Sequence, residues 1–237
     1  MFFFKRKEIV VDCFTYIEPV YLNFPIDKAI KFYPDEFKKL RPTAQENTIK
    51  LCRGVNDLYT SGFILPAWDT FTLTMIDDGK FLADANAKNV NTGYHSRDQY
   101  GSIYPNSGHI KLYSPWLIKE KTGVKFLWMQ PGWNRTDNSE KLNIVPAVVD
   151  FKYQYLSHIS MFIKKGTTVK YNIGDPLVHV IPLSENNIKI KTHLLEQEVW
   201  TKEFYAFENF QRYDNHRNLK YPKFLETKKC PFGFGVK

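Results

Sequence analysis

Cysteine is scarce in this sequence, and no apolar stretch is long. The three cysteines, Cys13, Cys52 and Cys230, lie far apart and form no CxxC pair. This spacing argues against a zinc knuckle and a disulfide scaffold. It predicts reduced thiols, with Cys13 and Cys52 buried. No apolar run reaches the roughly 18 residues of a membrane-spanning helix, and the apolar start precedes its basic residues, the reverse of a secretory signal. We therefore expect a cytoplasmic protein without a membrane partner.

The signatures of several well-known catalytic sites are also missing. The sequence contains no G-x-x-x-x-G-K-[ST] loop, no strand-linked G-x-G-x-x-G and no G-x-S-x-G elbow. No reaction can therefore be assigned from motifs.

Aromatic residues, in contrast, are abundant. They supply 16% of the 237 residues, with 19 Phe, 14 Tyr and 5 Trp against only 12 Gly, which favours β-structure packed on large rings. We expect an α+β, β-rich fold, either a β-sandwich or a distorted barrel of jelly-roll or β-clip type, with about 10–12 strands at regular spacing. The predicted strands include 8–17, 70–77, 109–118, 124–133, 144–151, 154–163, 168–173, 176–183 and 187–194.

Helices are expected at both ends of this β-rich body. Short helices are predicted over 26–33 and 35–40, and a longer one over 196–211. The Lys-Thr-Gly turn after residue 120 predicts that strands 109–118 and 124–133 form one hairpin, with a bend or bulge at Ser114-Pro115. We expect one globular domain over 1–211 and a basic, aromatic tail over 212–237.

The densest group of catalytic residue types lies in an irregular segment, 86–108. His95, Arg97 and Asp98 are the catalytic candidates there, and the Arg97 guanidinium suits a carboxylate or phosphate. The alternative is a solvated loop held by its own hydrogen bonds.

A divalent metal is the cofactor that the histidines suggest. His109, His179 and His193 are the metal-ligand candidates, because imidazoles from different strands can converge on iron or zinc. His179 and His193 fall on successive predicted strands and could face each other, with His179 pointing inward. The alternative is that these histidines are structural.

Two further segments suggest binding surfaces. Trp116, Trp128, Trp133 and Tyr113 crowd the central strands. Core packing explains most of them, and Trp133 with Arg135 is the expected exposed platform for sugars or bases.

The tail carries most of the excess positive charge. Its seven basic residues minus two acidic ones give +5 of the total +8. Rings interleave with cations there, which suits nucleic acid or the surface of a protein partner or second copy. A solvated terminus is the alternative. The binding candidates in the tail are Arg217, Lys220, Lys228 and Lys229.

Three stretches, VVDCFTY, SPWLIKEKTGVKFLWMQPGWN and GDPLVHVIPLSENNIKIKTHL, together resemble an uncharacterised protein family of tailed bacteriophages, notably those of marine bacteria, and of some bacteria. The likeness runs through most of 8–195. It implies a phage-type source, with the host cytoplasm or the virion as the location, and it assigns no activity. GDPLVHVIPL alone is similar to a late strand of the trimeric dUTPase and dCTP deaminase families, which implies a barrel-like or jelly-roll body.

The sequence thus leaves three functions open. The first is a phage-type binding or assembly protein without an assigned reaction. The second is a metal-dependent enzyme, oxygenase-like or hydrolase-like, with a histidine site inside a barrel. The third is nucleotide binding of the dUTPase type.

Overall fold

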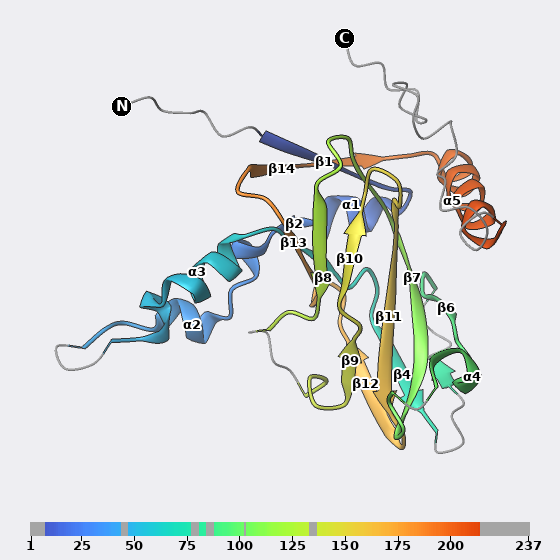
Figure 1. Cartoon of the computed structure of the whole chain (residues 1–237), viewed down its shortest axis with the longest axis horizontal. Coiled ribbons are helices and arrows are strands. Elements are labelled where there is room, and N and C mark those ends of the chain that lie inside the picture. The colour runs from blue at the N-terminus through green and yellow to red at the C-terminus, as the bar shows by residue number, and fades with distance from the viewer. Residues whose placement is uncertain are drawn as a thin grey trace, which may run out of the picture.

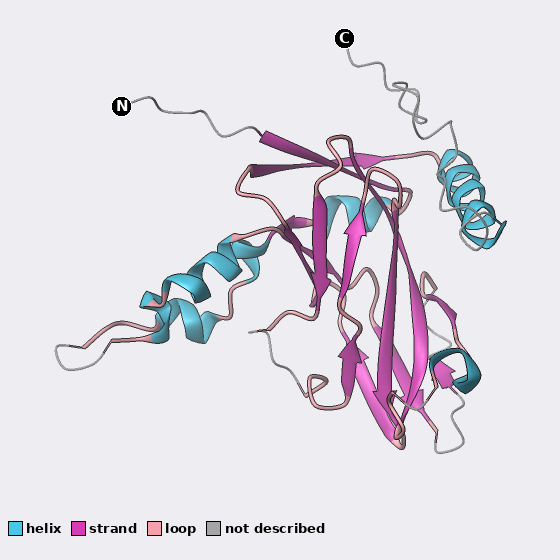
Figure 2. Cartoon of the chain, viewed as in Figure 1, coloured by secondary structure: helices cyan, strands magenta, loops and turns pink. Residues whose placement is uncertain are grey.

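Three β-sheets form the body of the molecule, and helices lie at its periphery (Figures 1 and 2). The structure is a computed structural model that describes residues 8–43, 47–76, 81–83, 88–101, 103–132 and 137–213. No sheet in these ranges closes into a barrel. The predicted β-rich α+β fold is confirmed in its sandwich-like form.

The largest sheet has six strands in the order β14-β1-β7-β11-β9, with β6 also paired to β7. β1 and β14 run parallel, and the other neighbours run antiparallel. Its strands are β1 (Glu8–Thr15), β6 (Asn91–Gly93), β7 (Ser107–Glu120), β9 (Leu142–Ile144), β11 (Leu156–Lys164) and β14 (Asn187–Leu194).

The two smaller sheets are antiparallel. The five-stranded sheet has the order β10-β8-β13-β3-β2, and the three-stranded sheet has the order β12-β4-β5. The former comprises β2 (Asp27–Lys28), β3 (Phe63–Pro66), β8 (Lys125–Met129), β10 (Ala147–Asp150) and β13 (Pro176–Pro182). The latter comprises β4 (Phe71–Met75), β5 (Phe81–Ala83) and β12 (Thr167–Tyr171).

One hydrophobic core is shared by all three sheets. On β4 the apolar residues Phe71, Leu73 and Met75 are buried while the threonines between them are only half-buried, as the alternation predicts. Trp116 and Trp128 are also buried in this core, at 0% and 3% exposure. These two rings therefore serve packing and cannot stack on a ligand.

An arm of short helices projects from one side of the sheets (Figure 1). The rings of Tyr33, Phe37 and Tyr59 hold it together, with centroids 4.6–5.5 Å apart. Of the remaining helices, α1 lies beside β1, and α4 and α5 lie on the side of the sheets opposite the helical arm (Figure 1). Their bounds are α1 (Glu18–Asn23), η1 (Ala29–Phe32), α2 (Asp35–Lys39), η2 (Ile49–Leu51), α3 (Arg53–Thr60), α4 (Arg97–Tyr100) and α5 (Gln197–Tyr213). No helix within the described ranges is long and apolar enough to cross a membrane.

The prediction of a helix over 26–33 is wrong. Asp27 and Lys28 pair with β3 instead, and only Ala29–Phe32 form a 3₁₀ turn before Pro34. The prediction that both thiols are buried is confirmed for Cys13, which lies in the core, and is wrong for Cys52, which is exposed. The predicted helices over 35–40 and 196–211 are confirmed as α2 and α5.

The hairpin expected around residues 120–124 does not form. β7 ends in the six-stranded sheet and β8 begins in the five-stranded one, so the turn joins two sheets. The last residues of β7 pair with β1, while β8 pairs with β10 and β13, so neither strand is available to the other. Glu120 stabilises the connection, because its buried carboxylate accepts hydrogen bonds from the backbone N–H groups of Thr122, Gly123 and Val124. The carboxylate thus supplies acceptors for backbone donors of the turn, which have no strand partner in the described ranges.

The bulge expected at Ser114-Pro115 is confirmed. Tyr113 pairs with His158 and Leu117 with Leu156, so three β7 residues oppose Ser157 alone. The Ser157 hydroxyl donates a hydrogen bond to the carbonyl of Trp116, which supplies a partner that the ladder lacks. Proline is tolerated inside this long strand because the bulge frees it from the ladder.

Candidate functional site

Two of the candidate histidines meet beside α4. His95 precedes the helix and His109 lies on β7, and their ring centroids are 4.6 Å apart. A capping box fixes the start of α4, because the Ser96 side chain accepts from the backbone of Gln99 while the Ser96 N–H donates to Gln99 Oε1 at 2.9 Å. This local bond network orients the segment that carries His95.

The two rings border a pocket of about 240 Å³. It is lined on one side by the α4 segment and on the other by β7 and the β11–β12 turn. The side chains that matter for its chemistry are His95, Arg97, Tyr100, Ser107, His109 and Lys165.

Positive charge dominates this pocket. Arg97 and Lys165 line it, and no Asp or Glu is among its described lining residues. Neither side chain forms an ion pair within the part of the chain that the structure describes. The Lys165 backbone N–H donates to the Asn106 carbonyl at 3.0 Å, which holds the turn against the segment before β7. The pocket therefore presents two cations without a carboxylate from its own walls.

His109 contributes an uncharged imidazole. Its side chain is buried, with 7% exposure. Burial, together with the charges of His95 and Lys111, lowers the pKa of His109 from 6.5 to about 4, so the ring is neutral near pH 7. Its Nδ1 atom is buried without a hydrogen-bond partner in the described structure. Such a group costs about 1–3 kcal/mol and is unusual in a folded protein.

Aromatic packing from β11 supports two residues that line the pocket, Tyr100 and His109. Phe162 stacks on Tyr104 at 4.0 Å between centroids and meets the edges of Tyr100 and His109 at 5.1 and 5.2 Å. These contacts limit the movement of the His109 ring. The side of the pocket lined by Tyr100 and His109 is therefore preformed.

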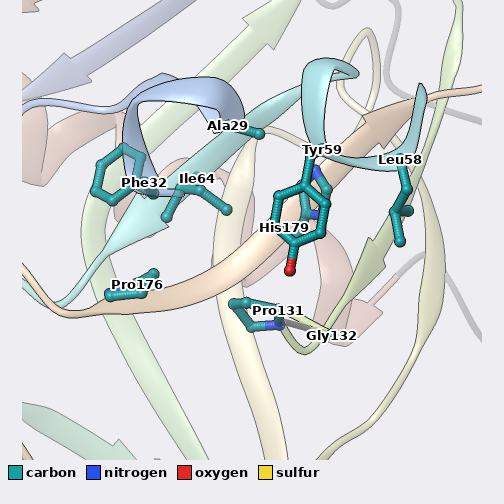
Figure 3. Close-up of a pocket in the computed structure, with 9 residues that line it drawn as sticks. All are labelled: Ala29, Phe32, Leu58, Tyr59, Ile64, Pro131, Gly132, Pro176 and His179. Atoms are coloured by element: carbon teal, nitrogen blue, oxygen red, sulfur yellow. The ribbon is translucent and has the colours of Figure 1, made fainter. Parts of the chain in front are cut away.

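His179 lies elsewhere, in the five-stranded sheet under the helical arm (Figure 3). It points inward, as expected, with 4% exposure. Its Nε2–H donates to the Ser61 carbonyl at 2.9 Å, and burial lowers its pKa. The surrounding cavity, lined also by Tyr59 and Pro131, measures only about 10 Å³, which is room for roughly one water molecule. His179 therefore connects β13 to the chain after α3.

His193 does not face His179. β14 belongs to the six-stranded sheet and β13 to the five-stranded one, so the expected pairing of these strands is wrong. The His193 Nε2–H donates to Asp12 Oδ1 at 2.9 Å, and the ring stacks on Phe14 at 4.7 Å. Both partners lie on β1, so these contacts fasten the parallel β1–β14 pair.

The candidate metal ligands thus occupy three separate places. Within the described ranges, no group of three or more His, Cys, Asp or Glu side chains is arranged to hold a metal ion. Among the candidate residues that the structure describes, only the His95 and His109 rings are brought into contact. Asp98 is exposed on α4 and does not line their pocket.

The six binding candidates fall outside the described residues. They are Trp133, Arg135, Arg217, Lys220, Lys228 and Lys229. The structure instead adds two residues that sequence reasoning missed, Ser107 and Lys165. The β7–β11 register brings them together by pairing Ser107 with Lys164. No local sequence signal announces such a long-range pairing.

Comparisons with known proteins do not add a function to this geometry. No protein-family model matches the chain, and no curated protein matches its sequence.

Proposed function

We propose that this protein is a binding protein whose pocket at His95, Arg97 and Lys165 takes an anionic group, either phosphate or carboxylate. The observation that carries the proposal is the pair of cations in a pocket with no carboxylate among its described lining residues. Arg97 can bind two oxygens of such a group through its planar guanidinium, and Lys165 adds a point charge.

The size of the pocket restricts which ligands can fit. About 240 Å³ is below the roughly 300–1,000 Å³ typical of sites for drug-sized molecules. The pocket therefore suits a small anion or one charged group of a larger ligand. The neutral His109 ring and the Ser107 hydroxyl supply uncharged hydrogen-bonding groups beside the two cations.

Calorimetric titration of the full chain with inorganic phosphate and with acetate tests the proposal. We expect Arg97→Ala combined with Lys165→Ala to weaken binding by about 10-fold to 100-fold, the value of a lost charge-assisted hydrogen bond. Lys125→Ala, which removes an exposed cation on β8, is the matched control and should leave affinity unchanged. Equal affinity of the double variant and the control for these anions would show that this pocket is not the anion-binding site.

The second candidate is a metal-dependent enzyme, and the close contact of His95 and His109 favours it. Two imidazoles need at least one more ligand for a catalytic zinc or iron site. Metal analysis of the purified full chain decides this point. Stoichiometric iron, zinc or manganese that disappears in His95→Ala would support the enzyme, and its persistence in that variant would contradict it.

The partners expected from the sequence remain part of the proposal. The chain would act in a phage-type assembly, and the segment after α5 would contact a protein, a second copy or nucleic acid. Comparison of the full chain with a chain ending at Tyr213 tests this, because loss of assembly or of salt-dependent nucleic-acid binding should follow the truncation. Identical behaviour of the two chains would contradict it.

A further inference from the structure

A second cleft is lined by residues of α5, β6 and β7, and it shares no described lining residue with the proposed anion pocket. Its volume is about 310 Å³, which is within the range of small-ligand sites. Its aromatic residues are Tyr16, Tyr113, Trp200, Phe204 and Tyr205.

The rings of this cleft are held in fixed orientations. Trp200 stacks on Phe204 at 5.0 Å and meets Tyr16 at 4.7 Å, while both α5 rings pack against the small core around Leu117. Tyr205 lies edge-on to Phe204 at 5.6 Å and remains 57% exposed. The cleft therefore combines anchored rings with one ring that a ligand can reach freely.

Two asparagines border the same cleft. The Asn89 backbone is fixed on both sides, because its carbonyl accepts from Trp68 Nε1 at 2.9 Å and its N–H donates to Asp69 Oδ2 at 3.2 Å. Asn91 lies opposite Tyr113 in the β6–β7 pair. Neither side-chain amide has a hydrogen-bond partner among the described residues. Each amide can both donate to and accept from a ligand.

This cleft differs from the anion pocket in the charge of its lining residues. None of its described lining residues carries a charge, and the nearby Lys111 ammonium lies 5.1 Å from the centroid of the Tyr113 ring. A nucleotide would bring phosphates against walls that supply no cation from these residues. A neutral ligand with an apolar ring face and several hydroxyls matches both the rings and the amides.

We propose that the cleft between α5, β6 and β7 binds a neutral saccharide. One sugar face would stack on the exposed side of the aromatic cluster, and the amides of Asn89 and Asn91 would bond its hydroxyls. The residues that line this cleft are separate from those of the anion pocket, so each site can be tested without the other.

Titration of the full chain with cellotetraose, maltotetraose and tri-N-acetylchitotriose tests the assignment, with adenosine and decaproline as competing chemistries. We expect at least one saccharide to bind with a Kd of about 1 mM or tighter. Tyr205→Ala and Asn91→Ala should each weaken it by roughly threefold to tenfold, since one stacking contact or hydrogen bond is lost. Both residues are exposed, so both variants should fold.

Tyr94→Ala is the matched control, because Tyr94 is an exposed tyrosine of the other pocket and should not affect saccharide binding. Absence of binding by all three saccharides at about 10 mM would overturn the proposal. So would saccharide binding that neither Tyr205→Ala nor Asn91→Ala weakens. Tighter binding of adenosine or decaproline than of any saccharide would overturn it as well.

Discussion

The carboxylate of Glu120 accepts a hydrogen bond from the backbone N–H of Gly123 at 2.8 Å, and the same carboxylate binds the N–H groups on either side. Glu120 is 1% exposed. Gly123 has a φ of +81°, a left-handed conformation that glycine adopts without strain. One buried side chain and one glycine together turn the chain out of the six-stranded sheet and into the five-stranded one.

Glu120→Gln replaces one carboxylate oxygen with an NH₂ group, and we expect this small change to destabilise the protein strongly. The amide keeps one acceptor oxygen but places an NH₂ group against backbone donors. The cost of unsatisfied buried groups predicts a loss of about 2–3 kcal/mol in the free energy of unfolding. Urea denaturation measures it, with Glu185→Gln on the exposed loop before β14 as the control. Equal midpoints for the two variants would show that the turn does not depend on Glu120.

Two glycines should respond in opposite directions to replacement by alanine. Gly62 has a φ of +75°, and a Cβ there would lie 2.0 Å from the Val180 carbonyl oxygen, so Gly62→Ala must displace the backbone beside β13. Gly54 lies in α3, and a Cβ added there would meet no described atom within 4 Å. We expect Gly62→Ala to destabilise by about 2 kcal/mol or more and Gly54→Ala to stabilise by about 0.5–1 kcal/mol. Thermal melts of the two variants check both signs.

Local patterns predicted most strands, because alternation depends only on neighbouring residues. Phe71, Leu73 and Met75 illustrate this, since their spacing alone places them on one face. Sheet membership depends on contacts that are distant in sequence. The turn after β7 has the composition of a hairpin, and none of its residues indicates that the end of β7 pairs with β1 while β8 pairs with β13.

The candidate site was likewise predictable only in part. The His95 and Arg97 segment stood out by composition, and the structure places both residues on one pocket. Lys165 reaches that pocket only through the β7–β11 register, which a single sequence does not encode in any short window. His179 and His193 lie on strands that follow each other along the chain, yet β13 and β14 belong to different sheets.

The thiols of Cys13 and Cys52 should differ sharply in reactivity. Burial and the neighbouring Asp12 carboxylate raise the pKa of Cys13, and its side chain is inaccessible in the core. Cys52 is exposed between η2 and α3. Native protein treated with iodoacetamide at pH 8 should be labelled at Cys52 and protected at Cys13, as peptide mapping by mass spectrometry would show. In denaturant both peptides should be labelled, and rapid native labelling of Cys13 would contradict its place in the core.

His109 should make the protein less stable in mild acid. Its pKa falls from 6.5 to about 4 on folding, so between these values the unfolded chain binds a proton that the folded chain does not. The stability that the neutral ring contributes is therefore complete above about pH 6.5, declines as the pH falls, and is fully lost below about pH 4. Because the ring borders an open pocket, we expect this contribution to be about 1–2 kcal/mol, less than the full pKa difference implies.

The variant His109→Gln isolates this effect from the other histidines. Burial also lowers the pKa of His158 to about 3, and that acid sensitivity is common to wild type and variant. Denaturant unfolding at pH 7 and pH 4 should show a smaller loss of stability for His109→Gln than for the wild type, by about 1–2 kcal/mol. Because glutamine does not titrate, a variant that loses as much stability as the wild type would show that His109 is not the group whose protonation opposes folding.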